Sequence, residues 1–194
     1  MISPTARIHQ TADVEDEVTI GDESRIWHQA QIRTRAGLGK RCIVGKGVFV
    51  DFDVVIGDDC KFQNYACVYH GVTIGRGVFV GPHAVFTNDM RPRATAPDFA
   101  PLRDGDWAVG ATVVEDGAAV GANSTILPNV RIGKWSMIAA GAIVTVNVAP
   151  YSLVVGAPAR HVAWLCPCGL KVTSSRCTRC GPVPEDHPLH SIGR

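Results

Sequence analysis

Four cysteines stand close together near the C-terminus, in the pattern Cys166-x-Cys168-Gly followed by Cys177-x-x-Cys180-Gly. Each pair can hold one side of a tetrahedral metal ion, and the glycine after each pair allows a tight turn beneath the thiolates. The spacing predicts a zinc site. Because sulfur fills all four positions, the zinc would be structural and not catalytic. The alternative interpretation is four reduced thiols.

A second group of chemically capable residues lies in the segment Val85-Phe86-Thr87-Asn88-Asp89-Met90-Arg91-Pro92-Arg93-Ala94. The Asn88 amide can orient a polar group but cannot act as a base, whereas the two arginines present guanidinium forks that match phosphate and carboxylate oxygens. His70 stands eighteen residues before Asn88, and its imidazole titrates near neutrality, so it can accept a proton. The alternatives are a turn asparagine, an exposed turn histidine and solvated loop charges.

These residues are embedded in a repeat with a period of six. Stepping by six from Ile8 to Phe86 meets only apolar residues, and the residue two positions before each of them is small. The phase breaks after Phe86 and resumes at Ala108, from which it continues to Val144. Six residues make one short strand and a turn, and three such units close a triangular coil whose strands pair in parallel with those of the next coil.

The repeat predicts an all-β protein, a parallel β-helix of about seven coils over residues 1–149. The phase break predicts a loop, residues 87–107, that leaves the helix. Residues 150–194 would form a C-terminal extension that carries the zinc knuckle at 166–181. A β-sandwich of evenly spaced short strands is the alternative, but such strands rarely keep one period over so many units.

The eighteen-residue coil predicts which side chains lie above one another, at the strand spacing of ~4.8 Å. One corner of the prism then collects Asn88, His70, Tyr69, Asp51 and Arg33, at the point where the loop departs. A polar corner beneath a loop that carries arginines predicts a pocket for an anionic ligand.

The composition excludes several classes of protein. The chain has 194 residues, 19% of them charged, and a formal net charge of +1. This near-neutral balance gives no electrostatic reason to expect nucleic-acid binding. No run approaches ~18 consecutive apolar residues, so membrane insertion is not expected. The first residues lack a basic region followed by an apolar run, so we expect a cytoplasmic protein.

Together with the repeats, several segments resemble the hexapeptide-repeat nucleotide-sugar N-acetyltransferases of surface-polysaccharide (O-antigen) synthesis. These segments are Val85–Ala94, Gly156-Ala157-Pro158-Ala159-Arg160, Trp164-Leu165-Cys166-Pro167-Cys168-Gly169, Ile26-Trp27-His28 and Gln63-Asn64. The most similar subgroup acetylates the 3-amino group of UDP-2-acetamido-3-amino-2,3-dideoxy-glucuronic acid. The runner-up acceptor is a dTDP-linked 3- or 4-amino-dideoxy sugar. The resemblance covers roughly residues 6–149.

The resemblance implies a left-handed β-helix, a homotrimer with active sites between neighbouring prisms, and acetyl-CoA as co-substrate. It also implies roles for individual residues. Asn88 and His70 would be catalytic, and Arg33, Gln63, Asn64, Tyr69, Arg91 and Arg93 would bind the nucleotide sugar. The donor would lie along the later coils near Ala122, Ala140 and Thr145, with its phosphates at Arg160.

Two other classes of function deserve comparison. A zinc-dependent carbonic anhydrase on this fold needs three converging histidines. His28 and His70 are 42 residues apart, which places them on different corners of one prism. A non-enzymatic scaffold would have no use for the loop at 87–107. The sequence therefore favours an acyltransferase over both.

Overall fold

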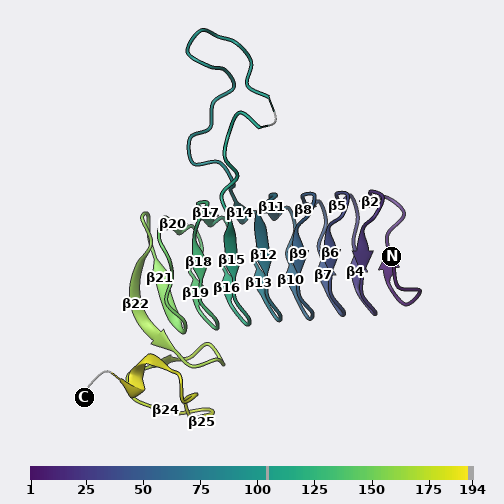
Figure 1. Cartoon of the computed structure of the whole chain (residues 1–194). Helices are drawn as coiled ribbons and strands as arrows, with labels where there is room; N and C mark the ends of the chain where they lie inside the picture. Colours follow the sequence, from purple (N-terminus) through teal and green to yellow (C-terminus); the bar gives the residue numbers. More distant parts are fainter. Residues whose placement is uncertain (104, 192–194) are drawn as a thin grey trace.

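The computed structural model describes residues 1–103 and 105–191, and it winds the chain into a three-sided parallel β-helix (Figure 1). The first face consists of β1 (Arg7–Ile8), β4 (Arg25–Ile26), β7 (Ile43–Val44), β10 (Lys61–Phe62), β13 (Phe79–Val80), β16 (Ala119–Val120), β19 (Met137–Ile138) and β21 (Ser152–Val155). The second face consists of β2 (Asp13–Val14), β5 (Gln31–Ile32), β8 (Phe49–Val50), β11 (Cys67–Val68), β14 (Val85–Phe86), β17 (Thr125–Ile126) and β20 (Ile143–Val144). The third face consists of β3 (Thr19–Ile20), β6 (Gly37–Leu38), β9 (Val55–Ile56), β12 (Val72–Ile74), β15 (Thr112–Val114) and β18 (Arg131–Ile132).

The inner column of the helix is the apolar repeat. In the two-residue strands after the first coils, the first residue faces outward and the second points inward, as in β10, where Lys61 is exposed and Phe62 is fully buried. Small residues such as Ala66 and Ala84 fill the positions between, also with no exposed surface. The all-β, parallel β-helix predicted from the sequence is therefore confirmed, and it agrees with the left-handed class that the resemblance implies. Ile8 is 37% exposed because the first coil has no coil before it.

The coil-to-coil register is eighteen residues, as predicted. Lys61 pairs with Phe79, and Cys67 pairs with Val85. At the corners the coils approach so closely that a Cβ on Gly57 would lie 2.7 Å from the carbonyl carbon of Gly75. This contact explains why glycine often follows the large apolar residue.

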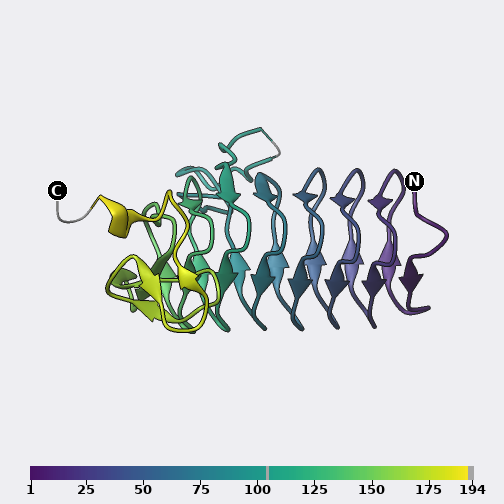
Figure 2. The same ribbon diagram turned by 90° about the horizontal axis from the view of Figure 1, so that it is seen from below.

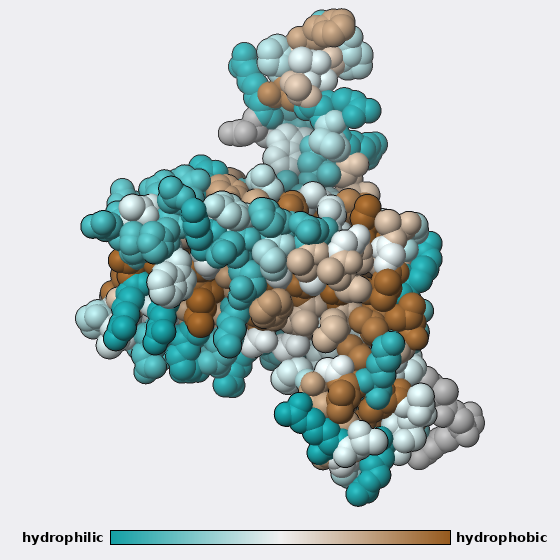
Figure 3. All heavy atoms as spheres, turned by 180° about the vertical axis from the view of Figure 1, so that it is seen from behind, coloured by the Kyte–Doolittle hydropathy of each residue, from teal (hydrophilic) through white to brown (hydrophobic). Residues whose placement is uncertain are grey.

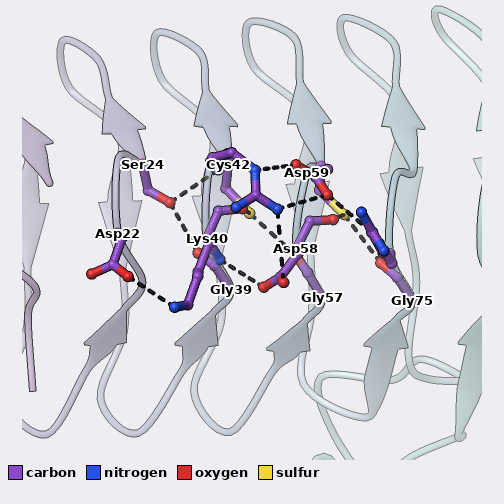
Figure 4. Close-up of polar contacts among 12 residues, drawn as sticks. Asp22, Ser24, Gly39, Lys40, Cys42, Gly57, Asp58, Asp59 and Gly75 are labelled. Carbon is purple, nitrogen blue, oxygen red and sulfur yellow. Dashed lines mark hydrogen bonds and ion pairs between the residues drawn. The ribbon is translucent and has the colours of Figure 1, made fainter.

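Polar side chains form hydrogen bonds and ion pairs between neighbouring coils along one corner (Figure 4). Lys40 pairs with Asp22 at 2.9 Å, and Arg41 pairs with Asp59 at 2.6 Å. Just inside this corner the buried Cys42 thiol donates to the carbonyl oxygen of Gly57 at 3.2 Å. These contacts satisfy polar groups at the turns and hold neighbouring coils together.

The phase break produces a long excursion from the body of the helix, between β14 and β15 (Figure 1). Its neck is closed by a hydrogen bond from the Gly110 N–H to the Asn88 carbonyl, at 2.8 Å. Strand pairing resumes at Thr112, slightly later than the sequence predicted, because Ala108 is exposed and lies on the excursion. Beyond the excursion the register is restored, with Val85 opposite Thr125.

The last rung lies beyond residue 149, where the sequence places the end of the helix. β21 pairs in parallel with β19, so the first face has eight parallel strands and the helix has about eight coils instead of about seven. β21 then turns into the antiparallel β22 (Arg160–Leu165), which pairs with β23 (Lys171–Val172).

The C-terminal extension packs against the end of the row of coils opposite to the N-terminus (Figure 1, Figure 2). It also contains β24 (Arg176–Cys177), β25 (Gly181–Pro182) and the 3-10 turn η1 (Pro188–His190). Among the residues that the structure describes, no helix is long and apolar enough to cross a bilayer.

Candidate functional site

Asn88 lies directly above His70, as the register predicts. The Asn88 Nδ2 donates to the backbone carbonyl oxygen of His70 at 3.2 Å. Both residues follow strands of the second face, β14 and β11, and both side chains are half-buried. The Oδ1 of Asn88 and the second hydrogen of its Nδ2 are left for a ligand.

The His70 ring is held from below by the preceding coil. Its Nδ1 lies 3.0 Å from the carbonyl oxygen of Phe52, and the ring stacks on the Phe52 ring with centroids 4.1 Å apart. The His70 N–H donates to Asp51 Oδ2 at 3.1 Å. These contacts give His70 one orientation.

Arg33 lies on this corner, but its guanidinium is already paired. Its Nη1 donates to Asp51 Oδ1 at 2.9 Å, and its Nε lies 3.4 Å from Glu15 Oε1. The hydrogen bond to the Asp51 carboxylate raises the pKa of Arg33. The structure therefore gives Arg33 a supporting contact on this corner, and its ligand-binding role stays a prediction. Tyr69, on the same corner, is 38% exposed and available to a ligand.

Arg91 and Arg93 line a cavity of about 590 Å³ within the excursion. Its wall also contains Trp107 and Asp89, together with Asn129 from the turn after β17. Within 1–103 and 105–191, neither arginine forms an ion pair, and the Arg93 guanidinium donates only to the neighbouring Pro92 carbonyl, at 2.8 Å. The cavity thus presents two guanidinium groups without an ion-pair partner beside the Asn88 corner, together with the carboxylates of Asp89 and Asp106.

Asn129 was not found by the sequence reasoning. Its side-chain oxygen accepts the Ala111 N–H at 3.1 Å, which ties the end of the excursion to the next coil. It lies one coil beyond Asn88 at the same corner, so the repeat of the sequence could have predicted that it is near Asn88.

Four other predicted residues lie on a different corner, after strands of the first face. They are Gln63, Asn64, Ala122 and Ala140. Asn64 Oδ1 accepts the Lys46 N–H at 3.0 Å, so this amide supports the stacking of coils. Within one chain, the structure does not bring this corner to Asn88. Thr145, by contrast, follows β20 on the Asn88 corner, where it is exposed.

Arg160 is exposed and lines a second cavity, of about 550 Å³, beside β20 and β22. Asn147, His161 and Trp164 also line it. The sequence reasoning singled out Arg160 alone; His161 and Trp164 lie on the same strand β22, and Asn147 joins them through the fold.

The four C-terminal cysteines converge. The sulfur atoms of Cys166, Cys168, Cys177 and Cys180 all lie within 4.8 Å of one another, and two of them, on Cys168 and Cys177, are 3.7 Å apart. A tetrahedral zinc with bonds of about 2.3 Å requires sulfur separations of about 3.8 Å. A hydrogen bond from the Arg179 N–H lowers the pKa of Cys177 to about 7, which favours the thiolate that binds metal. The residues therefore fit a zinc ion.

The extension is fixed to the helix by residues near these cysteines. The hydroxyl of Tyr151, the residue before β21, donates to Asp186 Oδ1 at 2.8 Å. Lys134, from the turn after β18, forms an ion pair with the same carboxylate. The buried His187 bonds through Nε2 to the Leu165 carbonyl at 3.0 Å.

Known proteins share both the repeat and the fold. A model of the bacterial transferase hexapeptide family matches six repeats, at residues 53–88 and 111–145. The 2,3,4,5-tetrahydropyridine-2,6-dicarboxylate N-acetyltransferase of Staphylococcus aureus is 36% identical over 90 residues, which are 46% of this chain and 32% of that protein. The dTDP-3-amino-3,6-dideoxy-alpha-D-galactopyranose 3-N-acetyltransferase of Aneurinibacillus thermoaerophilus is 41% identical over 63 residues, 32% of this chain and 33% of that protein.

These matches span only about a third of the length of either curated relative. Among solved structures, a mutant N-acyltransferase from Bacillus cereus in complex with dTDP and coenzyme A is similar, with a TM-score of 0.56. It is 16% identical, and the alignment covers 84% of this chain and 83% of that chain. At this identity the likeness concerns the fold alone.

Proposed function

We propose that this chain, which matches the model of the bacterial transferase hexapeptide family over residues 53–88 and 111–145, transfers an acetyl group from acetyl-CoA to an amino group of a nucleotide-linked sugar. The observation that carries the proposal is the position of Asn88 above His70, at the corner where the excursion begins. An amide and an imidazole thereby stand beside a cavity that offers Arg91 and Arg93. The relative from A. thermoaerophilus, which by its name acetylates a dTDP-linked amino sugar, supports the same class of acceptor.

The corner supplies groups for two needs of acetyl transfer to an amine, the orientation of the nitrogen and a destination for its proton. The reaction needs a neutral nitrogen held against the thioester, a destination for its proton and stabilisation of the oxyanion. The free Oδ1 of Asn88 can accept one amine N–H and so direct the nitrogen lone pair at the thioester. His70 is the titratable group beside it, and the exposed Tyr69 can bond a sugar hydroxyl.

Arg91 and Arg93 would bind the pyrophosphate or a carboxylate of the acceptor. Guanidinium groups match both kinds of anion, and these two are unpaired within the described residues. We favour a UDP-linked 2-acetamido-3-amino-2,3-dideoxy uronic acid of O-antigen synthesis as acceptor. The second candidate is a dTDP-linked 3- or 4-amino-dideoxy sugar, which the relative from A. thermoaerophilus favours. Since such metabolites are made in the cytoplasm, we place the reaction there.

The donor would lie along the later coils, past Ala122, Ala140 and Thr145, with its phosphates at Arg160. The cavity that Arg160 lines is large enough for part of a coenzyme, and the B. cereus enzyme of similar fold was solved with coenzyme A. Arg160 supplies the positive charge that phosphates require.

We infer a homotrimer in which two corners meet. Gln63 and Asn64 lie away from Asn88 within one chain, but the corner of one prism can face a different corner of its neighbour across a cleft. Apolar side chains gather on the surface over the later coils, whereas the N-terminal coils are more hydrophilic (Figure 3). Val146 and Val162 in this part of the chain are 59% and 55% exposed. Such a surface is typical of an interface between subunits.

The four C-terminal cysteines would hold a structural zinc ion. Their sulfur separations suit a tetrahedron, and the four sulfurs would fill all four coordination positions, so that none is left for water or substrate. The ion would hold together a unit whose small apolar cluster contains Val172 and Val183 and which docks through Tyr151 and Asp186. Zinc would thus stabilise the extension and take no part in the transfer.

The direct test is a thiol-release assay with acetyl-CoA and a panel of UDP- and dTDP-linked amino sugars. Transfer to at least one amino sugar, confirmed by the mass of the product, is the expected result. Asn88→Ala should lower turnover about tenfold, which is the effect of losing one orienting hydrogen bond. Absence of transfer across the panel would refute the proposal, and unchanged turnover in Asn88→Ala would remove this residue from the site.

A further inference from the structure

A single strand connects the cavity that Arg160 lines with the cluster of four cysteines. β22 begins at Arg160 and ends at Leu165, and the next residue, Cys166, is the first of the cysteines and is 2% exposed. Arg160, His161 and Trp164 of this strand all line the cavity of about 550 Å³. β22 leads from the last coil into the C-terminal extension (Figure 1). The positions of the cavity-lining side chains therefore depend on how the end of β22 is held.

Trp164 is the residue that contacts both sides. It lines the cavity, and it packs against the small apolar cluster that contains Cys166 and Cys177. The centre of its ring system lies 4.4 Å from that of His161, which also lines the cavity, and 6.2 Å from that of the buried His187 in the extension. A displacement of the cysteines or of His187 would therefore move one wall of the cavity through this side chain.

The apolar core of the extension is too small to hold this arrangement alone. It consists of four buried residues, two of which are cysteines: Cys166, Val172, Cys177 and Val183. The strands β23, β24 and β25 have two residues each, and the cysteines form no disulfide. Units of fewer than about 40 residues usually need a disulfide or a metal to fold, and residues 166–191 are fewer than that. Bonds from the four thiolates to a metal would supply the missing constraint.

The cavity offers the groups that recognise a nucleotide. Among the described residues, the guanidinium of Arg160 donates only to the carbonyl of the preceding residue, at 3.1 Å, which leaves its other N–H groups for phosphate. The Oδ1 of Asn147 accepts a backbone N–H at 2.8 Å, so its Nδ2 hydrogens remain for a ring nitrogen of a base. The half-buried Trp164 and its neighbour His161 provide aromatic surface on which a base can stack.

Resting on the use of acetyl-CoA proposed above, we propose that Trp164 binds the adenine ring of the donor by stacking and that the metal-bound cysteine cluster holds Trp164 in place for it. Asn147 then donates to the adenine, and Arg160 binds the phosphates beside it. The cysteines lie behind Trp164 and do not contact the thioester. They act on the affinity for the donor and not on the transfer step. The metal-free protein binds acetyl-CoA weakly but keeps its turnover at saturating donor.

Trp164→Ala tests the stacking contact. Stacking of a base on an aromatic side chain corresponds to about fivefold to a hundredfold in affinity, so the Kd of coenzyme A, measured by calorimetry without acceptor, should rise by such a factor. Trp164→Phe keeps a ring and should lose less. S-acetylpantetheine has the same thioester but no adenosine, so Trp164→Ala should leave its kcat/KM unchanged. The matched control is Trp135→Ala, because Trp135 is 40% exposed on another corner and does not line this cavity. It should keep the wild-type Kd.

Removal of zinc tests the role of the cysteines. With the zinc content measured before and after chelation, the Kd of coenzyme A should rise in the metal-free protein, by no more than in Trp164→Ala, and should return when zinc is added. In Trp164→Ala the same treatment should change the Kd little, because the side chain that links the cysteines to the cavity is absent. Cys180→Ser removes the exposed ligand and should act like chelation. Cys67→Ser, at a half-buried cysteine outside the cluster, is the matched control.

The possible failures can be told apart. A protein that holds no zinc, or equal affinity for coenzyme A in the zinc-bound, zinc-free and Trp164→Ala forms, would overturn this inference and leave the transferase proposal intact. An equal rise of the KM for S-acetylpantetheine and acetyl-CoA on zinc removal would show a general loosening and would also overturn it. A wild type that binds no coenzyme A would overturn both proposals. Binding of coenzyme A without transfer to any amino sugar would refute only the acceptor proposed above.

Discussion

Replacement of Arg91 and Arg93 by alanine separates binding of the acceptor from stability of the fold. Both side chains lie on the excursion, outside the coils, and both are exposed. Neither forms an ion pair in the described chain, and the single guanidinium bond is from Arg93 to the adjacent Pro92 carbonyl. The free energy of unfolding of Arg91→Ala and Arg93→Ala should therefore differ from that of the wild type by no more than about 0.5 kcal/mol, as for ordinary surface substitutions.

The expected effect on binding is much larger. A hydrogen bond to a charged group contributes about 1.5–3 kcal/mol, and each 1.4 kcal/mol corresponds to a factor of ten. Each substitution should thus raise the KM for the nucleotide sugar about ten- to a hundredfold, with a smaller change in turnover. If one arginine binds a C6 carboxylate, its loss should weaken a uronate acceptor more than a 6-deoxy acceptor.

The assay is thiol release at varied acceptor and saturating acetyl-CoA, with Arg103→Ala as the matched control. Arg103 carries the same charge on the same excursion but does not line the cavity. Equal effects of all three substitutions would show a general electrostatic influence and would refute specific contacts in the cavity. Equal losses for uronate and 6-deoxy acceptors would remove the preference for a uronate.

Three further predictions concern the scaffold. Phe62→Ala should destabilise the protein by about 3–5 kcal/mol in chemical denaturation, because the ring is fully buried in the inner column, whereas Lys61→Ala on the outer surface should change little. Chelation of zinc should loosen the C-terminal extension, measured by limited proteolysis, while turnover is partly retained; complete inactivation would contradict a structural role. The hydrogen bond from Lys134 lowers the pKa of Asp186 in the folded protein. The contact with Lys134 therefore stabilises the fold fully at pH values above the pKa of Asp186 in the unfolded chain, which is near 4. This stabilisation is lost as the pH falls through the lower pKa of the folded protein. The difference in unfolding temperature between wild type and Asp186→Asn should accordingly be present at pH 7 and shrink by pH 3, and an equal difference at both would contradict it.

Much of this architecture could be predicted because the inside of a three-sided helix imposes a strict period on the sequence. An inward residue such as Phe62 recurs every six positions, and three units return the chain to the same corner. The same eighteen-residue period predicts Asn88 above His70, and the structure contains that contact. In a repetitive fold, the number of residues between two positions predicts whether they lie next to each other in space; in a non-repetitive fold it does not.

The remaining features depend on side-chain geometry that no period encodes. The pairing of Arg33 with Asp51 and Glu15 could not be separated from a free ligand-binding arginine, since residue types alone do not assign partners. The docking of Asp186 onto Tyr151 joins segments 35 residues apart outside the repeat. The extra rung formed by β21 was missed because its register to β19 is sixteen residues instead of eighteen.

The excursion can bind the acceptor while the coils hold the reacting groups, because the insertion of the excursion leaves the pairing of the coils unchanged. The bond between the Gly110 N–H and the Asn88 carbonyl closes the neck, and the register resumes at Thr125 opposite Val85, so the coils continue as if no insertion were present. Asn88 and His70 are therefore held at the fixed spacing of neighbouring rungs, which suits groups that must meet a reacting atom. Arg91 lies on a segment free to vary in sequence without disturbing the helix. It follows that changes of acceptor among related chains should concentrate in the excursion, while substitutions on the rungs should act on turnover.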